Sequence, residues 1–143
     1  MTRFCLSLAA LALATIALPA GPANAASPDG TWLSEAGDVK MKVAPCGGAI
    51  CSHIEWLKEP NENGKPKVDK HNADESKRSR PVMGSAIILG MKPDGADKWS
   101  GQVYNAEDGK TYSGSFTLTG ANKADLKGCV AFICKSKGWT RSQ

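Results

Sequence analysis

The sequence predicts a small all-β protein, an antiparallel β-barrel of about eight short strands that follows a cleaved signal peptide. Three observations predict this fold class. Apolar and polar residues alternate in most segments after Asp29, tight-turn residues separate those segments at regular spacing, and no window has the period of an amphipathic helix. Regular short strands of this kind are typical of antiparallel barrels and sandwiches, and the barrel is the form that we expect.

The first 25 residues have the three parts of a secretory signal peptide. Arg3 makes the start positive, residues 4–18 are almost entirely apolar, and small residues stand three and one before a cleavage point at 23–25. A membrane anchor is the alternative, but the apolar run is shorter than the roughly 20 residues that a spanning helix needs. We therefore expect residues 1–25 to be removed, which leaves residues 26–143 as a single exported domain.

The expected strands follow one another along the chain, with a tight turn between most of them. Val39, Met41 and Val43 alternate with lysines, as a strand with one solvated face should. Asp108-Gly109 is a signal for a hairpin turn. The expected strands are, in order, the one that opens at Gly30-Thr31-Trp32 and those over 39–43, 50–57, 82–89, 99–104, 112–118, 126–130 and 133–141.

Tryptophans and glycines recur within these strands. The tryptophans lie beside aliphatic residues on strand faces, so we expect core packing, and a ligand-stacking cage is the alternative. The glycines suit the bends that a small barrel needs. The residues concerned are Trp32, Trp56, Trp99 and Trp139, and Gly84, Gly101, Gly114 and Gly128.

Four cysteines remain after the signal, in two pairs with the same C-x4-C spacing: Cys46 with Cys51, and Cys129 with Cys134. In an exported protein this pattern predicts two disulfides. Three connectivities are open, and we favour the two local ones because Gly47-Gly48 can form a tight turn. A four-thiolate zinc site is the alternative, but zinc ribbons use shorter spacings. We expect no metal and no cofactor.

Residues 58–80 form a long polar stretch without apolar periodicity, and long loops are often functional. Our candidate ligand-binding residues lie here: Asp69, Asn72, Arg78 and Arg80. The arginine side chains would bind a carboxylate or a phosphate at the edge of the barrel mouth. The alternative is structural, with Asp69 and Asn72 forming turns and the arginines pairing with carboxylates.

The sequence offers little support for catalysis. His53 and His71 are the only histidines, and the spacing of His71 from Asp69 matches no established pattern of metal ligands. No G-x-S-x-G elbow and no H-E-x-x-H motif occurs. We expect no catalytic residues and no enzyme, and a hydrolase ranks third among the functions considered.

The charge balance argues against nucleic acid as a partner. Loss of Arg3 with the signal lowers the formal net charge from +4 to +3, which is too small to indicate a nucleic-acid-binding protein. Four lysines and one arginine lie between residues 123 and 141, against Asp125 alone. Lysines on an edge strand protect it from pairing with another chain. The alternative is peripheral contact with an anionic envelope surface.

Two short motifs stand at the two ends of the expected domain. Gly30-x-Trp32 opens the first strand, and Trp139-Thr140-Arg141 ends the last one. This arrangement resembles lipocalin-like (calycin) barrels, in which a basic residue of the final strand covers the tryptophan of a G-x-W motif. The resemblance implies that Arg141 covers Trp32 and closes the barrel, a contact worth about 0.5–2 kcal/mol.

A longer series of motifs covers nearly all of residues 26–143. These motifs are Gly30-x-Trp32, Cys51-x-x-Ile54-x-Trp56-Leu57, Gly64-Lys65-Pro66-x-x-Asp69-x-x-Asn72, Arg78-x-Arg80-Pro81-x-x-Gly84, Trp99-x-Gly101-x-x-Tyr104, Asp108-Gly109-Lys110-Thr111-Tyr112 and Trp139-Thr140-Arg141. In this order they resemble family 2147 of the domains of unknown function, small exported bacterial proteins. The chain departs from the family pattern at Ser52 and at Asn105-Ala106, where glycine and Asp-Pro are more typical. The resemblance implies a periplasmic location and assigns no chemistry.

We expect a binding module for a small, anionic or envelope-derived molecule, because a small barrel has a mouth that the segment from Asp69 to Arg80 can gate. The alternative is a structural or stress-related protein of the envelope with a filled core. The interior distinguishes the two, because a barrel filled by tryptophan and isoleucine side chains has no room for a ligand.

Overall fold

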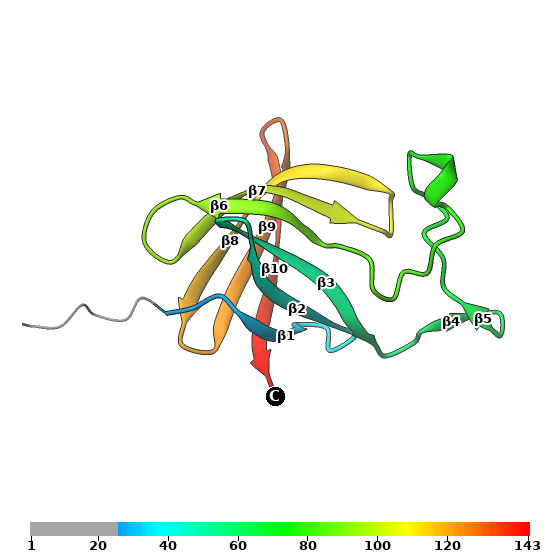
Figure 1. Cartoon of the computed structure of the whole chain (residues 1–143), viewed down its shortest axis with the longest axis horizontal. Coiled ribbons are helices and arrows are strands. Elements are labelled where there is room, and N and C mark those ends of the chain that lie inside the picture. Colours follow the sequence, from blue (N-terminus) through cyan, green and yellow to red (C-terminus); the bar gives the residue numbers. More distant parts are fainter. Residues whose placement is uncertain (1–25) are drawn as a thin grey trace, which may run out of the picture.

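Eight antiparallel strands close into a barrel in the computed structural model, which describes residues 26–143 (Figure 1). The prediction of a small all-β barrel is therefore confirmed, while the predicted signal peptide lies outside the described residues. Around the barrel the strands follow the order β1-β10-β9-β8-β7-β6-β3-β2. Their bounds are β1 Gly30–Ser34, β2 Val39–Cys46, β3 Ala49–Leu57, β6 Ile88–Pro93, β7 Lys98–Asn105, β8 Lys110–Gly120, β9 Lys123–Val130 and β10 Ile133–Ser142.

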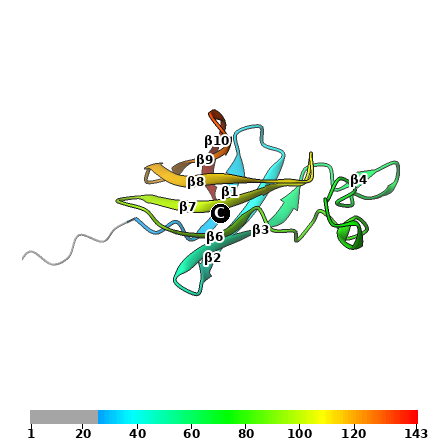
Figure 2. The ribbon, with the colours of Figure 1, turned by 90° about the horizontal axis from the view of Figure 1, so that it is seen from above.

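A long connection between β3 and β6 lies to one side of the barrel (Figures 1 and 2). It contains the two-stranded β4 (Asn61–Glu62) and β5 (Lys65–Pro66) and one 3-10 turn, η1 (Glu75–Lys77). We call residues 58–87 the side segment. Within the described chain, no helix is long and apolar enough to cross a bilayer.

The core occupies the end of the barrel where the β2–β3, β6–β7 and β8–β9 turns gather. Trp32 and Phe116 are completely buried there and meet edge to face, with ring centroids 5.5 Å apart. Strand alternation, which a bulge in the β6–β7 pairing interrupts between Leu89 and Lys92, places the other side chains at this end of the core. They are Met41, Val43, Ile50, Ile88, Met91, Leu118 and Ala124.

A row of glycines lets three neighbouring strands bend into the barrel wall. Gly101 is the register partner of Gly114, which is in turn the partner of Gly128 on β9. A Cβ atom on Gly114 would lie 2.3 Å from the carbonyl oxygen of Lys127, so no side chain fits at this position. Three of the four glycines predicted to suit bends therefore have a packing role. The fourth, Gly84, lies before β6, and a Cβ atom there would meet nothing within 4 Å.

The first and last strands are joined around one tryptophan. The guanidinium of Arg141 lies 4.3 Å from the ring centroid of Trp32. It also donates hydrogen bonds to the carbonyl oxygens of Asp29 (2.7 Å) and Ser27 (2.9 Å), so it secures the chain that enters β1. The arrangement is the one that the lipocalin-like resemblance implies.

Both predicted disulfides are present, and each joins the local pair. Cys46–Cys51 bridges the β2–β3 hairpin, and Cys129–Cys134 bridges the β9–β10 hairpin. Each bond therefore fixes the register of one hairpin at its turn.

Two expectations about the strands are corrected. Trp56 is 40 % exposed and lies beneath the ammonium of Lys40. The reason is a bulge in the β2–β3 pairing, which leaves Glu55 without a partner and turns the Trp56 side chain outward. The strand expected over 82–89 begins only at Ile88. Before it, Gly84 has a positive φ of 83° and the backbone bonds irregularly to β3.

Candidate functional site

The barrel holds a cavity at the end opposite the packed core. The β1–β2 turn, the end of β3, the side segment, the β7–β8 turn and the β9–β10 hairpin surround it, and its volume is about 1100 Å³. We call this space the mouth cavity. The barrel is thus filled at one end and hollow at the other.

The deep lining of the mouth cavity is apolar. Trp139 and Leu126 are buried residues of the core cluster, and they reach the cavity from β10 and β9. Residues from β2, β3, β7 and the side segment complete this lining. The apolar lining residues are Val39, Ile54, Ile87, Val103, Leu126 and Trp139.

Trp139 brings an unpaired hydrogen-bond donor to this region. Its side chain is 4 % exposed, and its indole N–H has no acceptor among the described residues. The other buried indole differs, because the N–H of Trp32 donates to the carbonyl oxygen of Pro28 at 2.9 Å. A buried donor without an acceptor is costly, so an acceptor supplied by a ligand would stabilise this part of the site.

One face of β10 runs from the cavity floor to its rim. Strand alternation places Ile133, Lys135, Lys137 and Trp139 on the same face, and all four line the cavity. Neither lysine forms an ion pair within the described residues. Two cations therefore lie between the apolar floor and solvent.

Acidic residues balance the lysines elsewhere on the rim. Lys70 pairs with Glu62 at 2.8 Å on the side segment. Asp38 accepts a hydrogen bond from Ser34, which together with the charges of Lys137 and Lys58 keeps the pKa of Asp38 below its usual value despite partial burial. Lys58 and Lys67 also line the cavity without an ion pair among the described residues, and the carboxylates of Glu59, Glu107 and Asp108 line it too. Lys135 and Lys137 differ from the other rim lysines in their place on β10, next to the apolar floor.

Three of the four candidate residues of the side segment meet around one buried carboxylate. Asp69 is completely buried and accepts hydrogen bonds from Tyr104 Oη (2.5 Å), Asn72 Nδ2 (2.8 Å) and Arg80 Nε (2.9 Å). Arg80 Nη2 lies 2.8 Å from the same carboxylate. Tyr104 belongs to β7, so this cluster, which we call the Asp69 clamp, fastens the side segment to the barrel.

The clamp favours the charged form of Asp69. Burial alone would raise the pKa of this carboxyl group, but the hydrogen bonds from Tyr104, Asn72 and Arg80 and the guanidinium charge outweigh burial and lower it. Burial and the neighbouring carboxylate raise the pKa of the Tyr104 phenol, which therefore stays a donor. Asp69 is an ion held by complementary donors.

Arg78, the fourth candidate, lies outside the clamp. Its Nε donates to the carbonyl oxygen of Asn72 at 2.8 Å, and its Nη1 pairs with the exposed Glu75 at 3.3 Å. The contacts are those of a residue that shapes the loop around η1, and Arg78 lines neither cavity described in this structure.

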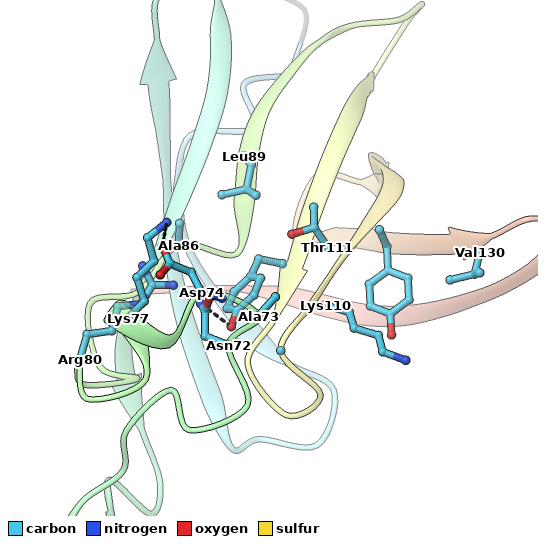
Figure 3. Close-up of a pocket in the computed structure, with 13 residues that line it drawn as sticks. Asn72, Ala73, Asp74, Lys77, Arg80, Ala86, Leu89, Lys110, Thr111 and Val130 are labelled. Atoms are coloured by element: carbon cyan, nitrogen blue, oxygen red, sulfur yellow. Dashed lines mark hydrogen bonds and ion pairs between the residues drawn. The ribbon is translucent and has the colours of Figure 1, made fainter.

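A smaller cavity of about 580 Å³ lies between the side segment and β8. Figure 3 shows Asn72, Lys77 and Arg80 gathered on one side of it, with Thr111 and Val130 on the other. Asn72 and Arg80 are thus both clamp residues and lining residues of this smaller cavity. Within residues 26–143, no group of three or more His, Cys, Asp and Glu is arranged to hold a metal ion.

Sequence reasoning missed two functional candidates. Tyr104 is separated from Asp69 by 35 positions, and its only signal was that both lie in motifs shared with the bacterial family. Trp139 was placed in the core, and nothing in its local pattern showed that its N–H would lack an acceptor. Both omissions concern contacts that depend on how the barrel closes.

Comparisons with known proteins identify one family model and similar solved structures. The family model described as "Uncharacterized protein conserved in bacteria (DUF2147)" matches residues 30–141. No curated protein matches the chain. A solved structure from Helicobacter pylori, described as belonging to the lipocalin family, is similar with a TM-score of 0.69 and 18 % identity, over 82 % of this chain and 84 % of that one. A redesigned β-barrel covers 87 % of this chain and 99 % of its own, with a TM-score of 0.47 and 15 % identity. The likeness to the Helicobacter pylori protein shows that the fold is lipocalin-like.

Proposed function

The chain belongs to the bacterial family DUF2147, and we propose that it is an exported binding protein that holds a small, mainly apolar molecule in its mouth cavity. The observation that carries the proposal is a barrel with one packed end and one hollow end. Its apolar floor and volume of about 1100 Å³ suit a small ligand, because ligand pockets are typically clefts of about 300–1,000 Å³ with few polar groups.

The polar groups of the cavity define the chemistry of the ligand. The apolar floor suits a hydrocarbon body, and the N–H of Trp139 offers a hydrogen bond to an acceptor on it. Lys135 and Lys137 offer two cations above the floor. An amphiphile with one anionic group, such as a fatty acid, satisfies all three features.

An exported location is part of the proposal. Two disulfides persist in oxidising compartments, and the start of the sequence has the composition of a signal peptide. We place the protein in the periplasm. Mass spectrometry of protein recovered from the periplasm should give a chain that begins at Ala26, and a chain that retains residues 1–25 would contradict this part of the proposal.

The Asp69 clamp supports ligand binding by holding one wall of the mouth cavity in position. Its residues fix the side segment, which forms one wall of the mouth cavity. We assign Asp69, Asn72 and Arg80 as positioning residues, and Arg80 keeps guanidinium N–H groups that are also available to an anion in the smaller cavity. Arg78 supports the loop around η1.

Titration with the fluorescent fatty acid cis-parinaric acid tests the proposal. We expect saturable binding to the wild-type protein, and at least about tenfold weaker binding to Val39→Trp, because the larger side chain enters the mouth cavity. Leu89→Trp is the matched control. Leu89 lines only the smaller cavity, so this variant should bind the probe within about twofold of wild type.

The methyl ester of the same probe separates charge from apolar contact. Lys135→Gln combined with Lys137→Gln should weaken binding of the acid and leave binding of the uncharged ester unchanged. Equal binding to wild type and Val39→Trp, or no binding to either, would overturn the assignment of the mouth cavity. Native mass spectrometry of protein purified from its own bacterium would then show whether any small molecule co-purifies.

A further inference from the structure

The turn between β9 and β10 carries the most exposed large apolar side chains of the described chain. Phe132 is fully exposed, Ile133 is 74 % exposed and Val130 is 57 % exposed. No described residue covers Phe132, and Val130 and Ile133 on either side of the turn are only partly covered. We call residues 130–133 the apolar tip. Large apolar groups gathered at one exposed point of a protein mark an interaction site.

A disulfide holds the apolar tip in one conformation. Cys129 and Cys134 face each other directly below it, and Val130 pairs with Ile133. Ala131 has a positive φ of 52°, in the first position of the turn. The tip is therefore a preformed feature, and presenting it to a partner costs little ordering entropy.

Only positive charge surrounds the tip along the hairpin. Between residues 127 and 137 the sequence contains Lys127, Lys135 and Lys137 and no acidic residue. None of the three lysines forms an ion pair in the described structure. The apolar tip and the lysines next to it are complementary to a surface with an anionic outer layer and an apolar layer beneath it.

The hairpin projects from the barrel wall, as Figures 1 and 2 both show. The pairing of β1 with β10 ends at the hydrogen bond that the Glu35 amide donates to the Gly138 carbonyl oxygen. From Ile133 to Lys137, β10 is paired with β9 alone. The tip can consequently reach a flat surface before the rest of the barrel does.

We propose that the apolar tip docks this protein on an anionic membrane surface, with Phe132 entering the lipid interface and the lysines contacting the headgroups. A single apolar anchor gives only marginal membrane binding, and a second electrostatic signal makes it stable. The hairpin provides both signals, the apolar residues at its turn and the lysines on its two strands. This proposal goes beyond the binding of a small molecule and does not depend on it.

The observations favour a membrane over another protein. A stable protein interface buries about 800 Å² on each partner, which is far more than one two-residue turn and its neighbours can present. A second copy of this chain would bring the lysines of two hairpins together, and like charges oppose such a contact. A fluid anionic surface has neither requirement.

Docking at the tip would also orient the mouth cavity. Ile133, Lys135 and Val130 line that cavity, so its opening would lie next to the membrane. An amphiphile could then pass between the bilayer and the barrel without crossing bulk water.

Vesicle flotation tests the proposal with protein made from the complete sequence, its N-terminus checked by mass spectrometry so that all variants are compared in the same form. Wild-type protein should bind phosphatidylcholine vesicles with about 30 mol% phosphatidylglycerol. It should bind pure phosphatidylcholine vesicles much less, and high salt should release it. Phe132→Ser should weaken binding roughly tenfold, and Lys127→Gln roughly fivefold.

Matched controls use residues away from the hairpin. Met83→Ser changes an apolar residue that is 38 % exposed on the side segment, and Lys92→Gln changes a lysine on β6. Both should bind as wild type does. Phe132 and Lys127 lie outside the lining of the mouth cavity, so their variants should retain the melting temperature and the binding of cis-parinaric acid. Phe132→Trp should keep vesicle binding.

Several results would overturn the proposal. They are equal vesicle binding by Phe132→Ser and wild type, equal binding to neutral and anionic vesicles, or an equal loss in Met83→Ser. Concentration-dependent dimers that disappear in Phe132→Ser, without vesicle binding, would assign the tip to a second copy. Failure of cis-parinaric acid binding with intact vesicle binding would refute the cavity proposal alone.

Discussion

A single buried carboxylate, Asp69, shows how one residue organises the irregular part of this barrel. Its oxygens are occupied by a phenol, an amide and a guanidinium, each from a different point of the chain. Because all of its donors are supplied by the protein, burial of the charge does not force it to neutralise. The clamp is therefore the fixed point from which the side segment is held.

Asp69→Asn should destabilise the protein at neutral pH by about 2 kcal/mol, because hydrogen bonds to a charged group are lost and Arg80 loses its ion partner. Since the folded pKa of Asp69 lies below the unfolded value of about 3.9, the ionised carboxylate stabilises the fold above that value. This stabilisation is lost as the pH falls through the folded pKa.

Urea unfolding at a series of pH values measures this effect. The difference between wild type and Asp69→Asn should shrink as the solution becomes more acidic than about pH 4. Asp94→Asn is the control, since Asp94 is exposed and should show only a small effect. A difference that stays constant from neutral to acidic pH would contradict the role of the Asp69 charge.

At the scale of elements, the side segment is positioned by the β7–β8 turn as well as by the clamp. Gly109, in that turn, has a φ of 71°, and a Cβ atom there would lie 1.7 Å from the carbonyl oxygen of His71. The turn and the segment thus meet backbone to backbone. Gly109, which the sequence indicated only as part of a hairpin turn, is therefore also the contact between the β7–β8 turn and the side segment.

Gly109→Ala should therefore lower the free energy of unfolding by about 1–3 kcal/mol more than Gly64→Ala does. Gly64 has almost the same φ, 73°, but a Cβ atom there meets nothing within 4 Å, so it reports the backbone strain alone. Chemical denaturation measures both variants. Hydrogen exchange should also increase in residues 67–87 of Gly109→Ala only, and equal losses in the two variants would refute the contact.

At the scale of the whole molecule, the barrel depends on a closure between its two ends in sequence. β1 pairs with β10 from Thr31 to Ser34, and Arg141, the register partner of Trp32, covers the Trp32 ring on the same face of this junction. The same guanidinium ties down the chain before β1 through Asp29 and Ser27. The Arg141 side chain consequently helps to hold β1 against β10 and covers the buried Trp32 at this end of the core.

Arg141→Ala should reduce the free energy of unfolding by about 1–2 kcal/mol, because the cation–π contact and the backbone bonds are lost together. Arg141→Lys should recover only part of this loss, since an ammonium lacks the planar group that stacks on Trp32 while donating to two carbonyl oxygens. Thermal and urea unfolding of both variants provide the measurement. An Arg141→Ala protein as stable as wild type would show that the strand pairing suffices for closure.

Local features of the sequence were sufficient for the architecture and insufficient for the site. Alternation, turn residues and cysteine spacing predicted the barrel, most of the strand positions and both disulfides, because each is decided within a few residues of chain. Trp56 escaped this reasoning, since a bulge opposite Lys40 reverses its direction and alternation alone cannot show a bulge.

The sequence by itself thus determined an all-β chain with a first strand at Gly30, a last strand that ends near Arg141, and two hairpins that are each closed by a disulfide. Only the tertiary structure decided that Asp69 meets Tyr104, that the Trp139 N–H has no acceptor within residues 26–143, and that the interior is packed at one end and hollow at the other. The physical reason is closure. The register of eight strands sets which side chains share the interior, and that register depends on pairings between residues more than a hundred positions apart, such as Trp32 with Arg141.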